Sequence, residues 1–320
     1  MALLLSLLLS LAPIPRRALA GSLLVVLALS PGSARSQDAD LADSYAVRCG
    51  AGIVESERSA YQPLPRGDVF CPLLADPKSV RSFVSYQRGD AADFAADIAA
   101  VGIGDQFGFF RIGGTRAGNG VQLGLSGSVF AQFDVGSSSY ELLNADYLIG
   151  LPLTVRFGSF SGRARVYHQS SHLGDEFLLR PNPPLRENLS FESAELLLSL
   201  DVGALRLYGG GERFFRREPE ALADALVHGG VELRPGAVAT LGNVVSARFV
   251  AAADVKTVRD SSWRTGVNVR AGFEFGRPGD GVAGGRRWSL LGEFYDGPSP
   301  YGQFHRSQVR LAGVGLHFTL

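Results

Sequence analysis

The sequence lacks two features that define common classes of protein. It has no surplus of positive charge, because 31 lysines and arginines are balanced by 31 aspartates and glutamates. Proteins that bind nucleic acid normally carry a basic excess that neutralises phosphates, so we expect no nucleic-acid partner. After residue 36 the chain also has no uninterrupted apolar run of the ~18 residues that a membrane-spanning helix needs. The mature chain is therefore expected to be soluble or to span a membrane with strands.

Charged residues of both signs are scarce. They make up 19% of the chain, against roughly 25% in soluble domains, whereas hydrophobic residues make up 46%. A chain of this composition can bury a core, which excludes wholesale disorder.

The first 36 residues have the features of an export signal. Arg16 and Arg17 precede the apolar run 18–29, and small residues then suit cleavage by signal peptidase. We therefore expect a signal peptide over residues 1–36, with an uncleaved anchor as the alternative.

Cysteine is limited to Cys49 and Cys71. Their spacing fits neither a zinc site nor a C-x-x-C redox pair. In an exported chain such a pair can persist as a disulfide, so a Cys49–Cys71 bridge and two unpaired thiols both stay open.

From about residue 80 onward the chain is a series of strand-like segments. Apolar and polar residues alternate within each segment, and turn residues separate the segments, which is the period-two pattern of strands. Strands of soluble sandwiches average about 5–6 residues, whereas a tilted membrane strand needs about 9–11, and these segments are long. The predicted strands are 80–89, 94–112, 119–134, 142–157, 160–172, 188–202, 203–214, 225–234, 246–258, 262–276, 286–297 and 307–320.

The alternation assigns opposite faces to neighbouring residues of these segments. In 160–172, Ala164 and Val166 share an apolar face, as Leu196 and Leu198 do in 188–202. Two arginines on one side of a strand are costly in lipid but suit a polar lumen. The predicted lumen-side residues are Arg163, Arg165, Gln169, Glu195, Ser199 and Asp201.

These patterns predict an all-β, antiparallel transmembrane β-barrel of about twelve strands over residues 80–320, after a periplasmic segment over 37–79. The ending Gly315–Leu320 resembles the Gly-x-x-aromatic-x-apolar signal by which outer-membrane barrels are recognised for assembly, with Leu320 in place of Phe. We expect the outer membrane of a Gram-negative-type bacterium as the location. The expected partners are outer-membrane lipids, lipopolysaccharide and the barrel-assembly machinery.

Four stretches resemble a bacterial family of unknown function that has barrel-type members. They are Asp68–Pro77, Asn144–Pro152, Tyr167–Arg180 and Asp296–Phe304. The resemblance implies the barrel fold and the exported location, and it implies no established activity.

The stretch His168-Gln-Ser170 places a base and a hydroxyl on one face of a strand. Residues two apart on a strand point the same way, and an imidazole can accept the hydroxyl proton of a nearby serine. Both residues continue the apolar wall of Val166, just before a long outer loop. On the next segment, Asn188 and Glu192 continue the lipid-side row, so a base, a nucleophile and an orienting group could meet outside the barrel.

This arrangement resembles the outer-membrane phospholipase A and lipid A deacylase barrels, whose His-x-Ser pair and Asn or Glu lie on the lipid face. The resemblance implies His168 as general base, Ser170 as nucleophile, and Glu192 or Asn188 as the residue that holds the imidazole tautomer. Ser171 stands where those families usually have Asn.

Two functions stay open on the sequence. The first is a pore, transport or structural barrel, in which the polar residues at 168–192 merely line the rim. The alternative is a Ser-His lipid esterase at the outer leaflet. No cofactor is expected, although Asp175, Glu176 and Asp296 could bind Ca²⁺ through carboxylate oxygens at the outer rim.

Overall fold

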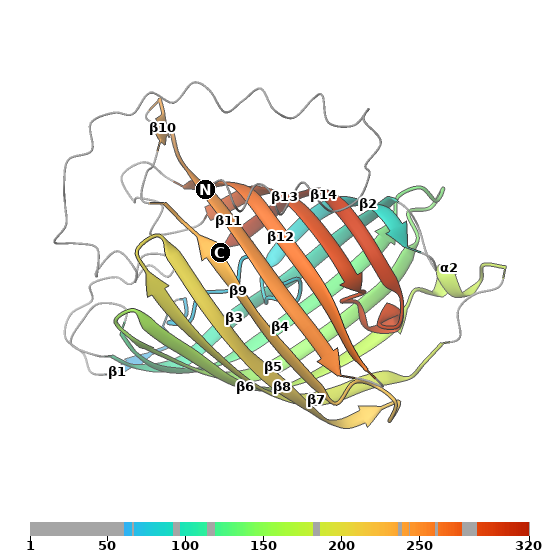
Figure 1. Ribbon diagram of the computed structural model, residues 1–320, viewed down its shortest axis with the longest axis horizontal. Coiled ribbons are helices and arrows are strands. Elements are labelled where there is room, and N and C mark those ends of the chain that lie inside the picture. The colour runs from blue at the N-terminus through green and yellow to red at the C-terminus, as the bar shows by residue number, and fades with distance from the viewer. Residues whose placement is uncertain are drawn as a thin grey trace. The chain divides into compact units, whose positions relative to one another are not determined.

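Twelve long antiparallel strands close into a barrel in the computed structural model (Figure 1). The structure describes residues 61–65, 67–91, 97–113, 119–181, 186–235, 239–242, 244–259, 262–276 and 287–319. Neighbouring strands follow the order β3-β2-β14-β13-β12-β11-β9-β8-β7-β6-β5-β4, and the pairing of β3 with β4 closes the ring. The barrel strands are β2 (Ser82–Ala91), β3 (Asp97–Gly113), β4 (Gly120–Asp134), β5 (Leu142–Phe157), β6 (Phe160–Leu173), β7 (Leu189–Val202), β8 (Leu205–Glu218), β9 (Ala225–Leu233), β11 (Val245–Arg259), β12 (Trp263–Gly276), β13 (Arg287–Pro298) and β14 (Gln308–Thr319).

Each predicted segment corresponds to one barrel strand, so the predicted fold class is confirmed. The largest difference lies in β8, which we expected to end at residue 214. A register shift opposite Ser190 and Glu192 gives β8 an extra residue, and this bulge interrupts the alternation from which a strand is predicted.

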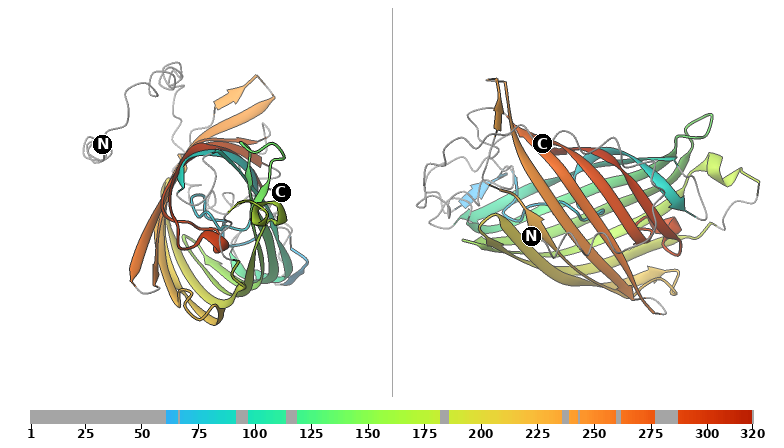
Figure 2. Two further views of the ribbon diagram at one scale, coloured as in Figure 1. Left: turned by 90° about the vertical axis from the view of Figure 1, so that its right-hand side faces the viewer. Right: turned by 45° about the horizontal axis from the view of Figure 1, so that its top comes forward.

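Short elements lie outside the closed path of the barrel. The strand β1 (Tyr61–Pro63) pairs with β3, and β10 (Ala239–Leu241) pairs with β11 and projects from the barrel (Figure 2). Within the described residues the helices are the single turn α2 (Asp175–Leu178) and the 3₁₀ turn η2 (Gly302–Phe304). No helix in the described part of the chain is long and apolar enough to cross a membrane.

The outer wall of the barrel is apolar. Along β7, Leu196, Leu198 and Leu200 are each about half exposed, and the alternate residues between them are buried. Ile149 and Leu151 of β5 continue this surface, with 55% and 53% of their area exposed. An exposed apolar band of this extent is unfavourable in water and suits contact with lipid tails.

The inner wall carries the charges. All six predicted lumen-side residues are buried, with 3–6% of their area exposed, which confirms the assignment. Glu195 forms ion pairs with Arg163 at 2.6 Å and Arg165 at 2.7 Å. Pairing of this kind offsets the high cost of removing a guanidinium and a carboxylate from water.

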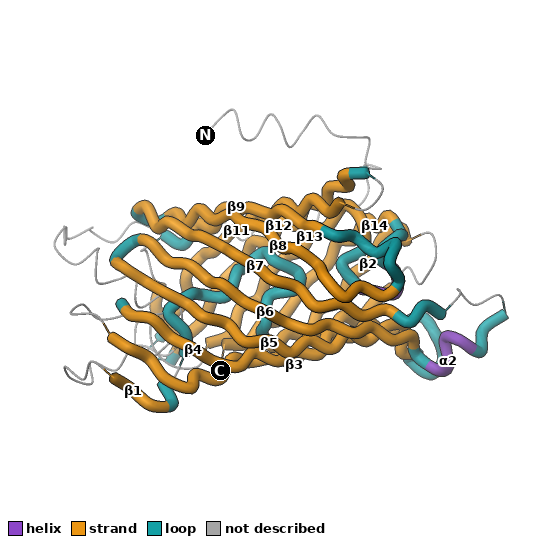
Figure 3. Tube along the Cα trace, turned by 90° about the horizontal axis from the view of Figure 1, so that it is seen from below, coloured by secondary structure: helices purple, strands orange, loops and turns teal. Residues whose placement is uncertain are grey.

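The core of the barrel forms around residues 67–81, here termed the plug, which lie inside the lumen (Figures 2 and 3). Val69, Phe70, Leu73 and Leu74 are at most 4% exposed. We expected residues 67–79 within the periplasmic segment 37–79. The sequence indicates only that they are not strand, and burial of their apolar side chains draws them into the barrel instead.

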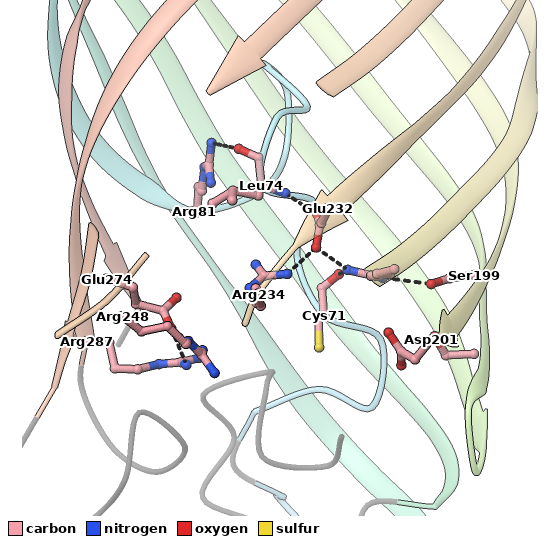
Figure 4. Close-up of polar contacts among 12 residues, drawn as sticks. Cys71, Leu74, Arg81, Ser199, Asp201, Glu232, Arg234, Arg248, Glu274 and Arg287 are labelled. Carbon is pink, nitrogen blue, oxygen red and sulfur yellow. Dashed lines mark hydrogen bonds and ion pairs between the residues drawn. The ribbon is translucent and has the colours of Figure 1, made fainter. Parts of the chain in front are cut away.

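Glu232 and Arg206 of the barrel wall attach the plug. Figure 4 shows Glu232 beside Leu74 of the plug. The backbone N–H of Leu74 donates to Glu232 Oε1 at 2.6 Å, and Glu232 Oε2 also pairs with Arg206 and Arg234. Arg206 Nη1 donates to the carbonyl of Cys71 at 3.0 Å. Buried backbone groups need hydrogen-bond partners, and here charged side chains of the wall supply them.

Further wall side chains reach the plug carbonyls from other strands. Arg156 donates from Nε to the carbonyl of Val69 at 2.8 Å and pairs through Nη1 with Asp201 at 2.8 Å. Asn268 donates to the carbonyl of Ala75 at 2.6 Å. The plug is therefore held from several sides of the barrel.

The outer end of the plug is held by two ion pairs. Asp76 contacts Lys256 of β11 at 2.6 Å, and Lys78 pairs with Asp146 of β5. Asp146 also accepts from the backbone N–H of Gly302 at 3.1 Å. One buried carboxylate thus connects the plug, the wall and an outer loop.

Cys71, in the plug, is disulfide-bonded. Cys49, the other cysteine of the chain, lies outside the described residues, as does the expected signal peptide over residues 1–36.

The substitution Glu232→Gln is expected to destabilise the barrel by about 3 kcal/mol, because it leaves two buried guanidiniums without their carboxylate. Denaturant titration of the protein folded in lipid vesicles measures the change. Glu220→Gln, at an exposed loop position, serves as the control and should change the free energy of unfolding by less than about 0.5 kcal/mol. Equal effects of the two substitutions would contradict the role given to Glu232.

Replacement of residues 69–80 by a glycine–serine linker of the same length is expected to raise ion conductance in planar bilayers. The wild-type lumen is filled, and removal of the plug leaves a water-lined space between the strands. Replacement of the outer loop 135–141 is the matched control. A folded, plugless barrel that conducts no better than wild type would refute the blocking role of the plug.

Candidate functional site

The predicted site lies on the outer wall, where β6 and β7 approach the long connection that contains α2. These two strands pair in antiparallel register, with His168 opposite Glu192 and Ser170 opposite Ser190. His168 and Ser170 continue the outward row of β6 that includes the half-exposed Val166, and Ser190 and Glu192 lie beside them in the outward row of β7. The sequence predicts this row from its alternation, but the register that joins the strands cannot be read from it.

His168 and Glu192 form a direct contact. His168 Nδ1 lies 3.3 Å from Glu192 Oε1, and the side chains are 44% and 28% exposed. A carboxylate at Nδ1 holds the imidazole orientation and leaves Nε2 available to a second group. Ser170 is the hydroxyl two residues further along the same face.

Asn188, the other predicted orienting residue, is placed differently. It immediately precedes β7, whose pairing with β6 ends at Leu189 opposite Ser171. It lies four positions before Glu192, which is about 13 Å along an extended chain. Of the two orienting candidates, the structure therefore brings Glu192 to His168.

Apolar side chains surround the polar group on the outer wall. Ile149 lies opposite His168 on β5, and Tyr147 lies opposite Ser170. On the other side, Phe215 of β8 lies opposite Glu192. Each of these three side chains is between 41% and 55% exposed. The polar residues thus interrupt a surface that is otherwise suited to lipid.

A charged cluster lies on the rim beside the site. Arg213, opposite Ala194, pairs with Asp224 at 2.8 Å, and Asp224 also pairs with Arg259 at 2.6 Å. The hydrogen bond from Arg259, with Arg213 nearby, holds the pKa of Asp224 at about 2. Asp224 therefore stays ionised at neutral pH and offsets part of the positive charge at this edge.

An esterase site also needs hydrogen-bond donors for the oxyanion of the tetrahedral intermediate. Backbone amides over 171–175 are the nearest candidates in the sequence, and one of these, at Gly174, donates to the carbonyl of Leu143 at 3.2 Å. A substrate oxygen would have to compete with such bonds or approach the loop beyond them.

The acids proposed for Ca²⁺ make other contacts. Glu176 accepts from Ser139 Oγ at 3.0 Å, and Asp296 pairs with Arg310 at 2.6 Å. Asp175 and Glu176 begin α2, whereas Asp296 lies on β13. Binding of Ca²⁺ at the outer rim stays a prediction.

A second polar cluster, inside the lumen, is missing from the sequence-based prediction. Glu195, Glu212 and His228 lie on three successive strands, and atoms of all three lie within 4.8 Å of one another. Alternation predicts that each faces inward, but only the strand register brings them together.

Comparison of folds places the chain among outer-membrane β-barrels. An active-site mutant of outer membrane phospholipase A from Escherichia coli has a TM-score of 0.50 and 13% identity, and the match covers 85% of this chain and 98% of that one. The phospholipase itself has a TM-score of 0.49 and 14% identity, covering 77% and 99% of the two chains. A KdgM porin has a TM-score of 0.39 and 11% identity, covering 73% and 97%. At these identities the likeness establishes the fold alone.

The sequence comparisons establish the family. No curated protein matches the chain. The family described as "Protein of unknown function (DUF1207)" matches residues 33–320, most of the chain, and this confirms the resemblance found in the four sequence stretches. The chain therefore belongs to the DUF1207 family, whose function is unknown.

Proposed function

We propose that the protein is an outer-membrane barrel that hydrolyses an acyl ester of an outer-leaflet lipid. The observation that carries the proposal is the 3.3 Å contact between His168 Nδ1 and Glu192 Oε1, next to Ser170 on the lipid-facing wall. The apolar outer wall supports the location in a membrane, and the long connection beyond β6 supports an outer position for the site.

The proposed reaction follows the roles that these side chains can take. Ser170 Oγ attacks the ester carbonyl while His168 Nε2 accepts its proton, and the resulting imidazolium is stabilised by Glu192 at Nδ1. The imidazolium then gives the proton to the departing alkoxide, which leaves an acyl group on Ser170. Water, activated by the same imidazole, releases the fatty acid and restores the serine.

The location of the group supports this role over a purely structural one. Polar side chains in contact with hydrocarbon are unfavourable unless they are paired, and a structural strand at this depth favours aliphatic or aromatic residues. A hydrophobic substrate in the outer leaflet would reach the group without leaving the membrane.

A passive pore, the other function expected from the sequence, has less support. The plug occupies the lumen, and buried wall side chains such as Arg156, which pairs with Asp201, hydrogen-bond to its backbone. Transport through this barrel would require the plug to move, and a structural role requires no site on the outer wall.

The substitution Ser170→Ala is expected to lower fatty-acid release by about 10³-fold or more, because it removes the attacking oxygen. The measurement uses the purified barrel in detergent with phospholipid or lipid A, with and without Ca²⁺. Ser190→Ala, which changes the outward hydroxyl directly opposite Ser170, is the matched control and should retain activity. Absence of activity in wild type with every substrate, or equal rates in both variants, would overturn the proposed function.

Two further substitutions test which residue orients the imidazole of His168. Glu192→Gln is expected to reduce the rate by about 100-fold, since the amide no longer stabilises the imidazolium, whereas Asn188→Ala should cause a smaller loss. Rates at saturating substrate measure the difference in both variants. A larger loss from Asn188→Ala would assign the orienting role to Asn188.

A further inference from the structure

The cluster of Glu195, Glu212 and His228 faces the lumen from β7, β8 and β9. Glu195 lies directly opposite Glu212 in the strand register, and the three residues are at most 9% exposed. One ligand atom from each lies within 4.8 Å of those of the other two. The site on the outer wall does not involve any of these residues.

His228 presents an unused nitrogen in this cluster. Its Nδ1 lies 3.4 Å from Asp254 Oδ2, and Nε2 has no hydrogen-bond partner among the described residues. A buried nitrogen without a partner is unfavourable. A histidine whose one nitrogen contacts a carboxylate commonly uses the other to bind a metal ion.

The two carboxylates are held in place by the wall. Glu195 accepts from Arg163 and Arg165, and Glu212 accepts from Tyr167 and, at 3.1 Å, from Ser193 Oγ. Contacts of this kind orient metal-binding carboxylates in other sites.

The local charge favours a cation. The carboxylates of Glu195, Glu212 and Asp254 outnumber the guanidiniums of Arg163 and Arg165. The nearby ammonium of Lys256 is balanced by its own ion pair with Asp76 at 2.6 Å, so with a neutral His228 the cluster has a net negative charge. Asp254 Oδ1 also has no hydrogen-bond partner among the described residues. A bound cation would compensate both features.

We infer that Glu195, Glu212 and His228 bind a divalent transition-metal ion. Two carboxylate oxygens and one imidazole nitrogen suit Zn²⁺, Mn²⁺ or Fe²⁺, whereas Ca²⁺ and Mg²⁺ prefer oxygen alone. Ligand atoms around a tetrahedral ion lie about 3.3 Å apart, so binding draws the three side chains slightly together.

The cluster adjoins a cavity through one of its members, Glu212. Glu212, Arg165 and Tyr167 line a cavity of about 140 Å³ inside the barrel, beside the plug residues Asp76 and Lys78. Three protein ligands leave at least one coordination position of the ion free, and this position can face the cavity.

Calorimetry tests the inference on the full mature chain, purified in detergent without a histidine tag, stripped with chelator and titrated with Zn²⁺. We expect one site in wild type and a loss of affinity of about tenfold or more in His228→Gln and in Glu212→Gln. His317→Gln is the matched control, because His317 is also buried and contacts only one carboxylate, Glu293, at 2.8 Å. It should bind Zn²⁺ like wild type.

Two outcomes would overturn the inference: no binding of Zn²⁺ by wild type, or equal affinity in wild type and His228→Gln, which indicates adventitious binding at surface histidines. X-ray absorption at the zinc edge is measured on wild type, so it tests the inference even where a variant does not fold. Wild type should give one imidazole with oxygen donors, and two or more imidazoles would exclude this cluster. Ser170→Ala should bind Zn²⁺ normally, so the result is independent of the proposed esterase.

Discussion

Buried guanidiniums shape the interior of this barrel, because an arginine removed from water needs both an anion and acceptors for its remaining donors. Arg156 meets both needs with Asp201 and the carbonyl of Val69, and Arg206 pairs with Glu232 and donates to the carbonyl of Cys71. The plug has no sheet partners for its irregular backbone. It can stay in the lumen because the same arginines that pair across the wall also satisfy its carbonyls.

The parts that could be predicted from the sequence are those set by a local pattern. Period-two alternation is enough to find the twelve strands and to place Arg163 inside and His168 outside. The contact between His168 and Glu192 depends on the register in which β6 pairs with β7. This register cannot be read from the pattern of residues within either strand. The plug escaped prediction because residues 67–81 have no period, and their burial results from contacts with residues far along the chain.

A single strand, β6, contributes to both of the proposed sites. Its outward row holds His168 and Ser170, whereas its inward row holds Arg165 and Tyr167, which orient the carboxylates of the luminal cluster. Because consecutive residues of a strand point to opposite faces, the two sets of side chains lie on opposite sides of the barrel wall although they belong to one strand. The lipid-facing chemistry and the luminal chemistry can therefore change independently, provided that the strand keeps its register with β7.

The position of the plug in the chain constrains the order of events when the barrel is built. Residues 67–81 directly precede β2, and β2 pairs with β14, the last strand of the chain. The seam between β2 and β14 can form only after all other strands have been made, while the plug is already present at the first strand. The plug is therefore tethered beside the seam where the barrel closes, so that one step can both close the sheet and enclose the plug.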